Sequence, residues 1–544
     1  MTWLRDVAFL GVLLGGFAAL GYGLLPRTKH APVDRYDAAA YREPSFTATV
    51  DRVDAAFRTN WANQNLSATE RASDLLVMRR LSLALVGTVP SLEEIRQFET
   101  LPEAERLPWW IDHLQTDPRS RAFLAERIAR ATVGTEDGPF LLFRRGRFTT
   151  WLGEELGKNT PYDAIVRELV SAKGIWTDRP SANFVTVTSN PETNNQPDPI
   201  RLAGRITRAF LGIRLDCAQC HNHPFAAWKQ SDFQGLAAFF GQTHVGLTGV
   251  YDGEGDFKVE DKKSQQEVAV EPAVPFAKEL LPSDGARRDR LAAWLTHPKN
   301  PYFARATVNR FWAIMFGRPL VAPLDNLDGD DASAEKTGTL SDRVLTILSD
   351  DFIEHGFDLR RLIRLIARTQ AFQLDSAAPF ELTEQHERHW TTFPMVRLRP
   401  EQVAGALLQA ASVQTIDGSS HVVSRLIKFG QQNDFLKRYG DGTENEFDEH
   451  GGTIPQRLLM MNGQLVREKI APNPFNASAQ FAIMATTNAK AIEGAYLAVL
   501  TRRPTSEELR HFEDFLSETE LNKQQKLEDI YWTLVNSTEF SWGH

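Results

Sequence analysis

The chain opens with one long apolar run. Residues 7–25 (VAFLGVLLGGFAALGYGLL) carry no charge. A helix of about 20 apolar residues spans the hydrocarbon core of a bilayer, so this run predicts an N-terminal membrane helix. The competing interpretation is a cleaved signal peptide, with Arg5 as its charged region and residues 19–21 as a small-residue cleavage site.

Apolar residues at helical spacing recur through both halves of the remaining chain and predict a mainly helical protein. Residues 74–86 show this spacing and end at Gly87, a residue typical of helix C-termini. Ser91 and Glu94 have the spacing of a capping box, so a helix is predicted to begin there. Further helices are predicted at residues 109–114, 121–131, 149–156, 162–172, 202–211, 287–296, 301–316, 340–355, 358–369, 400–413, 489–501 and 506–518.

Two stretches interrupt the helical pattern. Residues 175–200 are rich in Pro, Asn, Asp and Ser, and residues 184–187 (FVTV) alternate in a way that predicts one short strand. Residues 245–284 gain Gly, Asp, Lys and alternating Val, which indicates a loop or a small β excursion.

At 544 residues the chain exceeds what one hydrophobic core usually serves. We therefore predict a mainly α fold, in which two helical domains are joined by a loop-rich or small β excursion and preceded by a membrane helix. The predicted units are an anchor or signal segment at 1–30, a spacer at 31–49, a helical domain at 50–244, a linker at 245–284 and a second helical domain at 285–544.

Composition narrows the class of protein. Apolar residues make up 42% and charged residues 24%, as in ordinary globular proteins. The formal net charge of −9 gives no basic face on which to bind phosphates, so nucleic acid is excluded as a partner.

One short motif carries candidate chemistry. The only two cysteines are Cys217 and Cys220, and His221 follows at once (CAQCH). Two thiols at this spacing can each bond a haem vinyl group while the next imidazole binds the iron, so the motif predicts covalently attached haem c with His221 as the proximal ligand. The sixth iron ligand stays open among His244, Met315, Met395, Met460, Met461 and Met484.

Three other interpretations of the motif remain. Cys217, Cys220, His221 and His223 could bind zinc, although zinc sites usually draw their second ligand pair from farther along the chain. A redox dithiol would favour a thioredoxin-like setting, which the helical pattern does not provide. The cysteines could also simply pack. The aromatic residues between 225 and 240 could cover a porphyrin, although helices carry such residues into ordinary cores more often.

The motif also bears on location. Positive residues stand on both sides of the apolar run and do not by themselves favour export. Covalent haem, however, is attached on the outer side of the cytoplasmic membrane. A haem at Cys217 therefore predicts a membrane-anchored protein whose body lies on the outer, periplasmic side.

These motifs resemble a known domain pair. Residues 53–240, with 210–225 (FLGIRLDCAQCHNHPF) and 232–240 (DFQGLAAFF), resemble the planctomycete cytochrome-like domain of unknown function. Its usual C-terminal partner, another domain of unknown function, is matched by the following stretches: 291–296 (LAAWLT), 300–312 (NPYFARATVNRFW), 316–318 (FGR), 352–357 (FIEHGF) and 496–504 (YLAVLTRRP). The resemblance implies an exported, surface-associated protein and no established reaction.

The chain departs from that pattern after residues 316–318. The partner domain usually carries an Asn-Pro-Pro-Ser-His segment there, whereas residues 328–335 (DGDDASAE) occupy that place in this chain. They overlap an acidic stretch at 325–331. The stretch lacks the glycine and glutamate of a calcium loop, so we interpret it as a solvated acidic loop. Arg305, Asn309 and Arg310, which share a predicted helix, could line a polar site or brace neighbouring helices.

Two functions follow as hypotheses. The first is a redox protein that transfers electrons through haem to an exported partner. The second is a scaffold that holds a structural metal and binds an exported protein, a polysaccharide-associated protein or a polysaccharide. The chain has no nucleophile elbow and no zinc-protease motif, so the sequence leaves open whether it is an enzyme.

Overall fold

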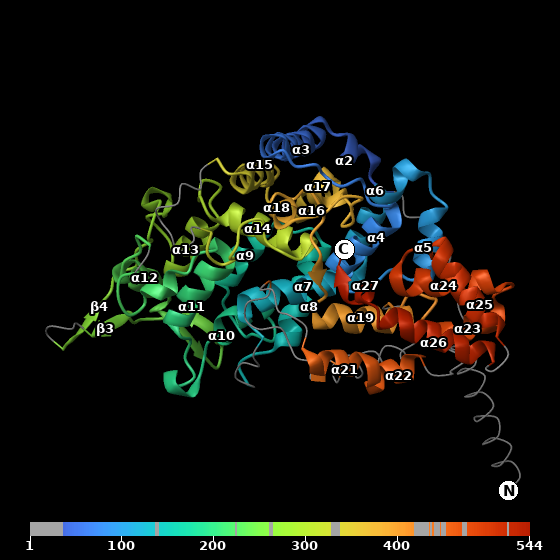
Figure 1. The fold of residues 1–544 in the computed structure, drawn as a ribbon. Coiled ribbons are helices and arrows are strands. Elements are labelled where there is room, and N and C mark those ends of the chain that lie inside the picture. The colour runs from blue at the N-terminus through green and yellow to red at the C-terminus, as the bar shows by residue number, and fades with distance from the viewer. Residues whose placement is uncertain are drawn as a thin grey trace, which may run out of the picture.

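Helices make up most of the structure. The computed structural model describes residues 36–543 apart from 136–140, 224–225, 261–264, 328–337, 418–434, 436–437, 440–446, 448–452, 471–475 and 519–521. In these residues the strands form short two-stranded antiparallel pairs, and the pair of β3 (Lys258–Glu260) and β4 (Glu267–Ala269) projects from one edge of the helical body (Figure 1). The mainly helical prediction is confirmed.

The predicted membrane helix needs correction. No helix among the described residues is both long enough and apolar enough to span a bilayer. The run at residues 7–25, on which the prediction rested, lies outside those residues. The long helix α3 (Pro44–Gln64) is polar over much of its surface, since it carries charged and amide side chains between its buried residues.

Local capping explains where the first helices begin and end. They are α2 (Ala38–Arg42), α3, α4 (Asp74–Val86), α5 (Leu92–Glu99), α6 (Glu103–Thr116), α7 (Pro118–Val133), α8 (Arg145–Gly157) and α9 (Tyr162–Ser171). Gly87 ends α4 with a φ of 72°, in the left-handed region that glycine adopts at little cost. Ser91 and Glu94 form the predicted capping box of α5. Helix α4 therefore ends, and α5 begins, where the sequence predicted.

The strand predicted at residues 184–187 is wrong. Residues Asn183–Thr186 form the short helix α10, and all four side chains are buried. A half-exposed strand would bury alternate side chains only. The β-branched and aromatic residues are instead packed on all sides, so tertiary burial outweighs their preference for strands.

The middle of the chain contains two α-helices, two β-hairpins and several short helical turns. Its α-helices and strands are α11 (Pro199–Ile206), α12 (Gln230–Ala237), β1 (Thr243–Gly246), β2 (Gly249–Asp252), β3 (Lys258–Glu260) and β4 (Glu267–Ala269). Its other helical turns are η1 (Pro180–Ala182), η2 (Pro191–Thr193), the π-helix η3 (Thr207–Leu211), η4 (Leu215–Ala218), η5 (Ala238–Phe240) and η6 (Lys278–Leu280). Val245 pairs with Val250, and Val259 pairs with Val268.

The second half is again helical, apart from one strand pair. Its elements are α13 (Arg287–Leu295), α14 (Phe303–Phe316), α15 (Leu340–Glu354), α16 (Leu359–Arg368), α17 (Gln370–Gln373), α18 (Glu384–Arg388), β5 (Val396–Arg397), α19 (Pro400–Ala410), α21 (Ile454–Asn462), α22 (Gln464–Ile470), α23 (Ala477–Met484), α24 (Asn488–Leu500), α25 (Ser506–Ser517), α26 (Lys523–Val535), α27 (Thr538–Ser541) and β6 (Trp542–Gly543). Strand β5 pairs with β6, so the C-terminal end of the described chain returns to the helical body.

The hydrophobic core is shared between distant parts of the chain. Helix α3 packs against α15, and α4 packs against α14. Two buried arginines of α4 bind further segments of the second half: Arg79 donates to the carbonyl of Val499 on α24, and Arg80 donates to the carbonyls of Phe372 and Leu374 at the end of α17. Burial lowers the pKa of Arg79 to about 10 and that of Arg80 to about 9. Backbone carbonyls thus supply hydrogen bonds to guanidinium groups taken out of water.

A partly buried carboxylate between α3 and α17 predicts a pH-dependent stability. Asp54 accepts a 2.7 Å hydrogen bond from the backbone N–H of Gln370, and burial raises the pKa of Asp54 to about 6. The unfolded value is about 4, so ionisation destabilises the folded state progressively between pH 4 and 6 and fully above that range. Asp54→Asn keeps the acceptor oxygen. It should therefore raise the free energy of unfolding at pH 7 by about 1–2 kcal/mol.

Denaturant unfolding of the wild type and Asp54→Asn at pH 4 and pH 7 checks this prediction. At pH 4 the two proteins should have nearly equal stability, because the carboxyl is then protonated in much of the folded population. An Asp54→Asn variant that was less stable than the wild type at pH 7 would contradict the account.

Candidate functional site

The CAQCH motif lies on an exposed turn that follows α11 and η3. Cys217 falls within η4, while Cys220 and His221 follow in a bend. The two thiols are exposed and are not joined by a disulfide. Ala218, between them, is buried and fixes the turn to the core. The motif therefore exposes two thiols and one imidazole on a turn that is packed against the core at Ala218.

Gly212 turns the chain from η3 into the motif. Its φ is 62°, and a Cβ at this position would lie 3.0 Å from Cγ of Leu327 and 3.3 Å from the carbonyl oxygen of Leu324. The backbone N–H of Leu327 donates a 2.8 Å hydrogen bond to the Gly212 carbonyl. The start of the motif is thus held against a loop more than a hundred residues later in the sequence.

Ion pairs tie the same turn to that loop. Arg208 binds Asp216, the residue before Cys217, with Nη2 and Oδ2 2.7 Å apart. Asp325 accepts from Arg208 at 3.3 Å and from Arg214 at 2.8 Å. The hydrogen bond to Asp216 raises the pKa of Arg208, so the guanidinium stays charged. The interpretation of 325–331 as a solvated acidic loop is therefore wrong for Asp325, which anchors the turn; residues 328–331 lie outside the described part.

His221 has the hydrogen-bonding pattern of a metal-binding histidine. Its Nδ1 lies 2.7 Å from the backbone carbonyl oxygen of Asn222. A carbonyl only accepts, so Nδ1 carries the proton and Nε2 keeps its lone pair. Metal-binding histidines usually donate their other ring N–H in this way, which fixes the tautomer and the ring orientation.

His223 has the opposite pattern. The backbone N–H of Ala226 donates a 2.8 Å hydrogen bond to Nδ1 of His223. The Nδ1 lone pair is therefore in use, and in the neutral ring Nε2 carries the proton. A histidine in this state offers no lone pair to a metal until that hydrogen bond breaks. The hydrogen bonds of His221 and His223 therefore suit the two side chains to different roles.

The four side chains proposed for zinc do not bring their donor atoms together. Among the described residues, one group gathers its potential ligand atoms within 4.8 Å, and it consists of Glu94, His113 and Asp117. Both carboxylates of that group accept hydrogen bonds from Arg119, so a guanidinium already neutralises them. Neither place resembles an assembled zinc site.

The aromatic residues after the motif belong mostly to the core. Phe233, Phe239 and Phe240 are buried on α12 and η5 and contribute to the main hydrophobic cluster. Trp228 is partly buried, and its ring centroid lies 6.1 Å from that of Phe276. These rings therefore support the base of the turn; residues 224–225 lie outside the described part.

The candidates for a sixth iron ligand lie in several environments. His244 on β1 donates from Nε2 to the carbonyl oxygen of Glu254 at 3.0 Å, which removes that nitrogen as an acceptor. Met315 and Met460 are buried in the core, whereas Met395 and Met484 are exposed. Met461, on α21, is partly buried.

The polar residues of α14 brace the helical body. Arg305 pairs with Asp342 of α15 at 2.7 Å. Asn309 exchanges two hydrogen bonds with the backbone of Val321. Arg310 is buried, and that burial lowers its pKa. The bracing interpretation is confirmed for Arg305 and Asn309.

The sequence identified the motif but not the residues that hold its turn in place. Arg208, Arg214, Asp216 and Asp325 hold the turn, and only Asp216 had a local signal, because it directly precedes Cys217. The partnership with Asp325 depends on the packing of the second half against the first. No spacing rule within one segment predicts such a contact.

Two protein-family models match the chain, one in each of the two regions that carry the motifs of the domain pair. Residues 52–245 match the PSCyt2 model, described as a protein of unknown function (DUF1549), and residues 287–516 match the PSD1 model, described as a protein of unknown function (DUF1553). No curated protein and no solved structure matches the chain. The two matches occur in the order that the motifs predicted. The chain therefore belongs to the proteins that carry a PSCyt2 domain followed by a PSD1 domain.

Proposed function

We propose that the chain is an exported redox protein that holds covalent haem at Cys217, Cys220 and His221. The observation that carries this proposal is the contrast within the motif. Two exposed thiols share a turn with His221, whose Nδ1–H is bound to a carbonyl and whose Nε2 is therefore available to iron. His223, which zinc would require, has its Nδ1 lone pair occupied.

Each residue of the motif has a distinct role in this proposal. The thiols of Cys217 and Cys220 each add across a vinyl group, which forms one C–S bond and places the thiol hydrogen on the neighbouring carbon. The addition consumes no oxidant. His221 holds the iron from the same turn, and its hydrogen bond to Asn222 keeps the ring oriented. Haem bound in this way supplies one-electron transfer.

The ion pairs that hold the turn in place suit a site that transfers electrons to a partner protein at the surface. Asp216 and Asp325 bind Arg208, and Asp325 also binds Arg214, so the exposed turn has a fixed base. Electron transfer to another protein needs a group close to the surface and little movement of the frame around it. Because haem of this type is attached outside the cytoplasmic membrane, the proposal also implies an exported body with an exported redox partner.

Haem staining tests the proposal. The full chain, made in a host with a cytochrome maturation system, should retain peroxidase activity on a denaturing gel, because thioether bonds survive unfolding. Cys217→Ser combined with Cys220→Ser should abolish the staining completely. Gln219→Ala is the matched control, since this exposed side chain lies between the cysteines and both thiols remain.

Two results would overturn the proposal. One is a folded wild-type protein that carries no haem in that host. The other is staining that persists in the double cysteine variant. Thermal melting of the wild type, the double cysteine variant and Gln219→Ala shows whether a protein that lacks haem is still folded.

A further inference from the structure

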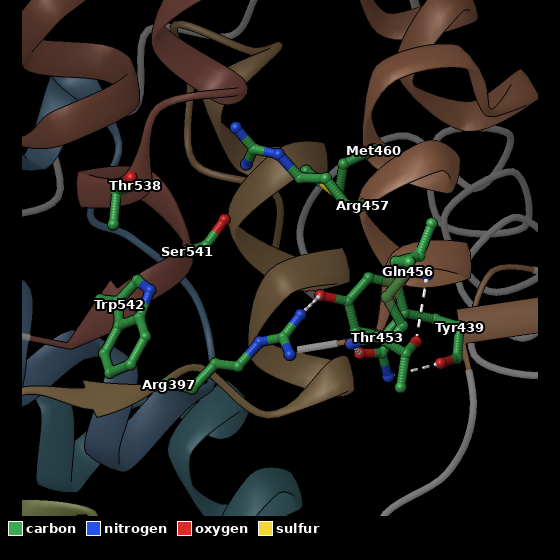
Figure 2. A pocket seen from close by; sticks show the side chains of 10 residues that line it. Arg397, Tyr439, Thr453, Gln456, Arg457, Met460, Thr538, Ser541 and Trp542 are labelled. Atoms are coloured by element: carbon green, nitrogen blue, oxygen red, sulfur yellow. Dashed lines mark hydrogen bonds between the residues drawn. The ribbon is translucent and has the colours of Figure 1, made fainter. Parts of the chain in front are cut away.

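A cavity far from the motif is lined by two arginines. Its volume is about 280 Å³, and it lies where α21, α27 and the strand pair β5–β6 meet (Figure 2). The motif turn precedes α12, which lies at the left of the molecule in Figure 1, whereas α21 and α22 lie along its lower side. The residues that line the cavity are Arg397, Tyr439, Thr453, Ile454, Gln456, Arg457, Met460, Thr538, Ser541 and Trp542.

The charged side chains among the described lining residues are both positive. They are Arg397 and Arg457, and none of the described residues that line the cavity is a carboxylate. Arg397 donates to the hydroxyl of Tyr439 at 3.1 Å, and Arg457 donates to the carbonyl of Asn536 at 2.6 Å. In the part of the chain that the structure describes, neither arginine forms an ion pair. Two positive charges thus border one small space with neutral hydrogen-bond partners only.

The guanidinium groups retain donors that can serve a ligand. A guanidinium carries five N–H donors in a planar fork that matches carboxylate and phosphate oxygens. One donor of each group is used in the contacts above. Figure 2 shows both guanidinium groups bordering the same space, with the hydroxyl of Ser541 between them. Ser541 is largely buried, so this hydroxyl belongs to the cavity wall rather than to the open surface.

The remaining walls suit a small hydroxylated molecule. Hydroxyl groups of Thr453, Thr538 and Ser541 offer hydrogen bonds, while Trp542 and Met460 offer apolar surface. An indole ring packs well against the C–H face of a ring-shaped ligand. Pockets that combine apolar walls with a few placed polar groups are typical of small-molecule sites.

We propose that this cavity binds a small oxyanion, a carboxylate or phosphate group, carried on a hydroxylated body. Arg397 and Arg457 bind the anionic group from two sides, and Ser541 donates to it from between them. Trp542 packs against the body of the ligand. The site is independent of the CAQCH motif, so it gives the second half of the chain a binding role of its own.

Calorimetric titration of the full chain tests the site with three probes: inorganic phosphate, glucuronate and glucose. Phosphate and glucuronate should bind, and glucuronate should bind more tightly because its ring also contacts the wall of the cavity. Glucose has the same ring without the carboxylate and should bind at least tenfold more weakly than glucuronate. Arg397→Gln and Arg457→Gln should each weaken glucuronate binding by about tenfold or more, as expected for a lost charge-assisted hydrogen bond.

Arg510→Gln is the matched control, because Arg510 lies on the surface of α25 away from the cavity and should leave binding unchanged. Arg457 is exposed, so its variant should fold even if Arg397→Gln does not. Absence of binding by both phosphate and glucuronate would overturn the proposal. Equal affinity for glucose and glucuronate, or an Arg457→Gln variant that binds as tightly as the wild type, would also overturn it.

Discussion

Replacing Asp351 with alanine should lower the free energy of unfolding by about 3–5 kcal/mol. Asp351 on α15 is 4% exposed and accepts hydrogen bonds from Nε and Nη2 of Arg361 at 2.8 and 2.9 Å. Thr49 of α3 donates to the same carboxylate at 2.9 Å. Glu43 also binds Arg361 at 2.8 Å, but its side chain is 46% exposed. Removing the Asp351 carboxylate therefore leaves a largely buried guanidinium without its buried counterion, and an uncompensated buried charge costs far more than the pair contributes when intact.

Denaturant unfolding of Asp351→Ala beside Asp342→Ala measures this effect. Asp342 lies on the same helix and pairs with Arg305, but both side chains of that pair are partly exposed. Loss of the Asp342 pair should cost about 1 kcal/mol or less. Equal losses in the two variants would contradict the claim that the contact of α3, α15 and α16 depends on a buried ion pair.

Replacing His221 and His223 separately should have very different effects on the visible spectrum. In His221→Ala both thiols remain, so attached haem should stay covalent but lose its proximal imidazole and show a clearly shifted spectrum. His223→Ala removes a side chain whose Nδ1 accepts from Ala226, and the spectrum should be unchanged. Absorption spectra of the two purified variants, with the wild type as reference, make the comparison.

The opposite result would make His223, rather than His221, the iron ligand. A shifted spectrum in His223→Ala together with an unchanged one in His221→Ala would mean that the hydrogen bonds of the two rings do not reflect their roles. Stoichiometric zinc in the wild type, lost in either variant, would favour the structural metal site instead.

Local signals predicted many of the helices, because capping and periodicity act within a few residues, but they did not predict α3, α12 or α26. The end of α4 at Gly87 and the start of α5 at Ser91 both follow from hydrogen bonds within one helical turn. The error at residues 184–187 has the opposite origin. There the pattern of residue types favoured a strand, while complete burial against α9, η1 and Phe210 favoured a helix.

The candidate site likewise combines features that the local sequence predicts with features that depend on the fold. Five adjacent residues carry the motif, so the sequence could locate it. The tautomers of His221 and His223 depend on backbone groups whose positions only the folded turn fixes. The anchoring role of Asp325 depends on packing between the two halves of the chain. The cavity between Arg397 and Arg457 likewise joins segments that no local pattern relates.

The most direct test of the central claim is the mass of one tryptic peptide. Cleavage after Arg214 and Lys229 releases residues 215–229 (LDCAQCHNHPFAAWK), which contain both cysteines and His221. Protein matured in an export-competent host should yield this peptide heavier than its sequence by one haem, with Soret absorbance at the same elution position. A peptide at its unmodified mass, with both thiols open to alkylation, would contradict covalent haem at this site.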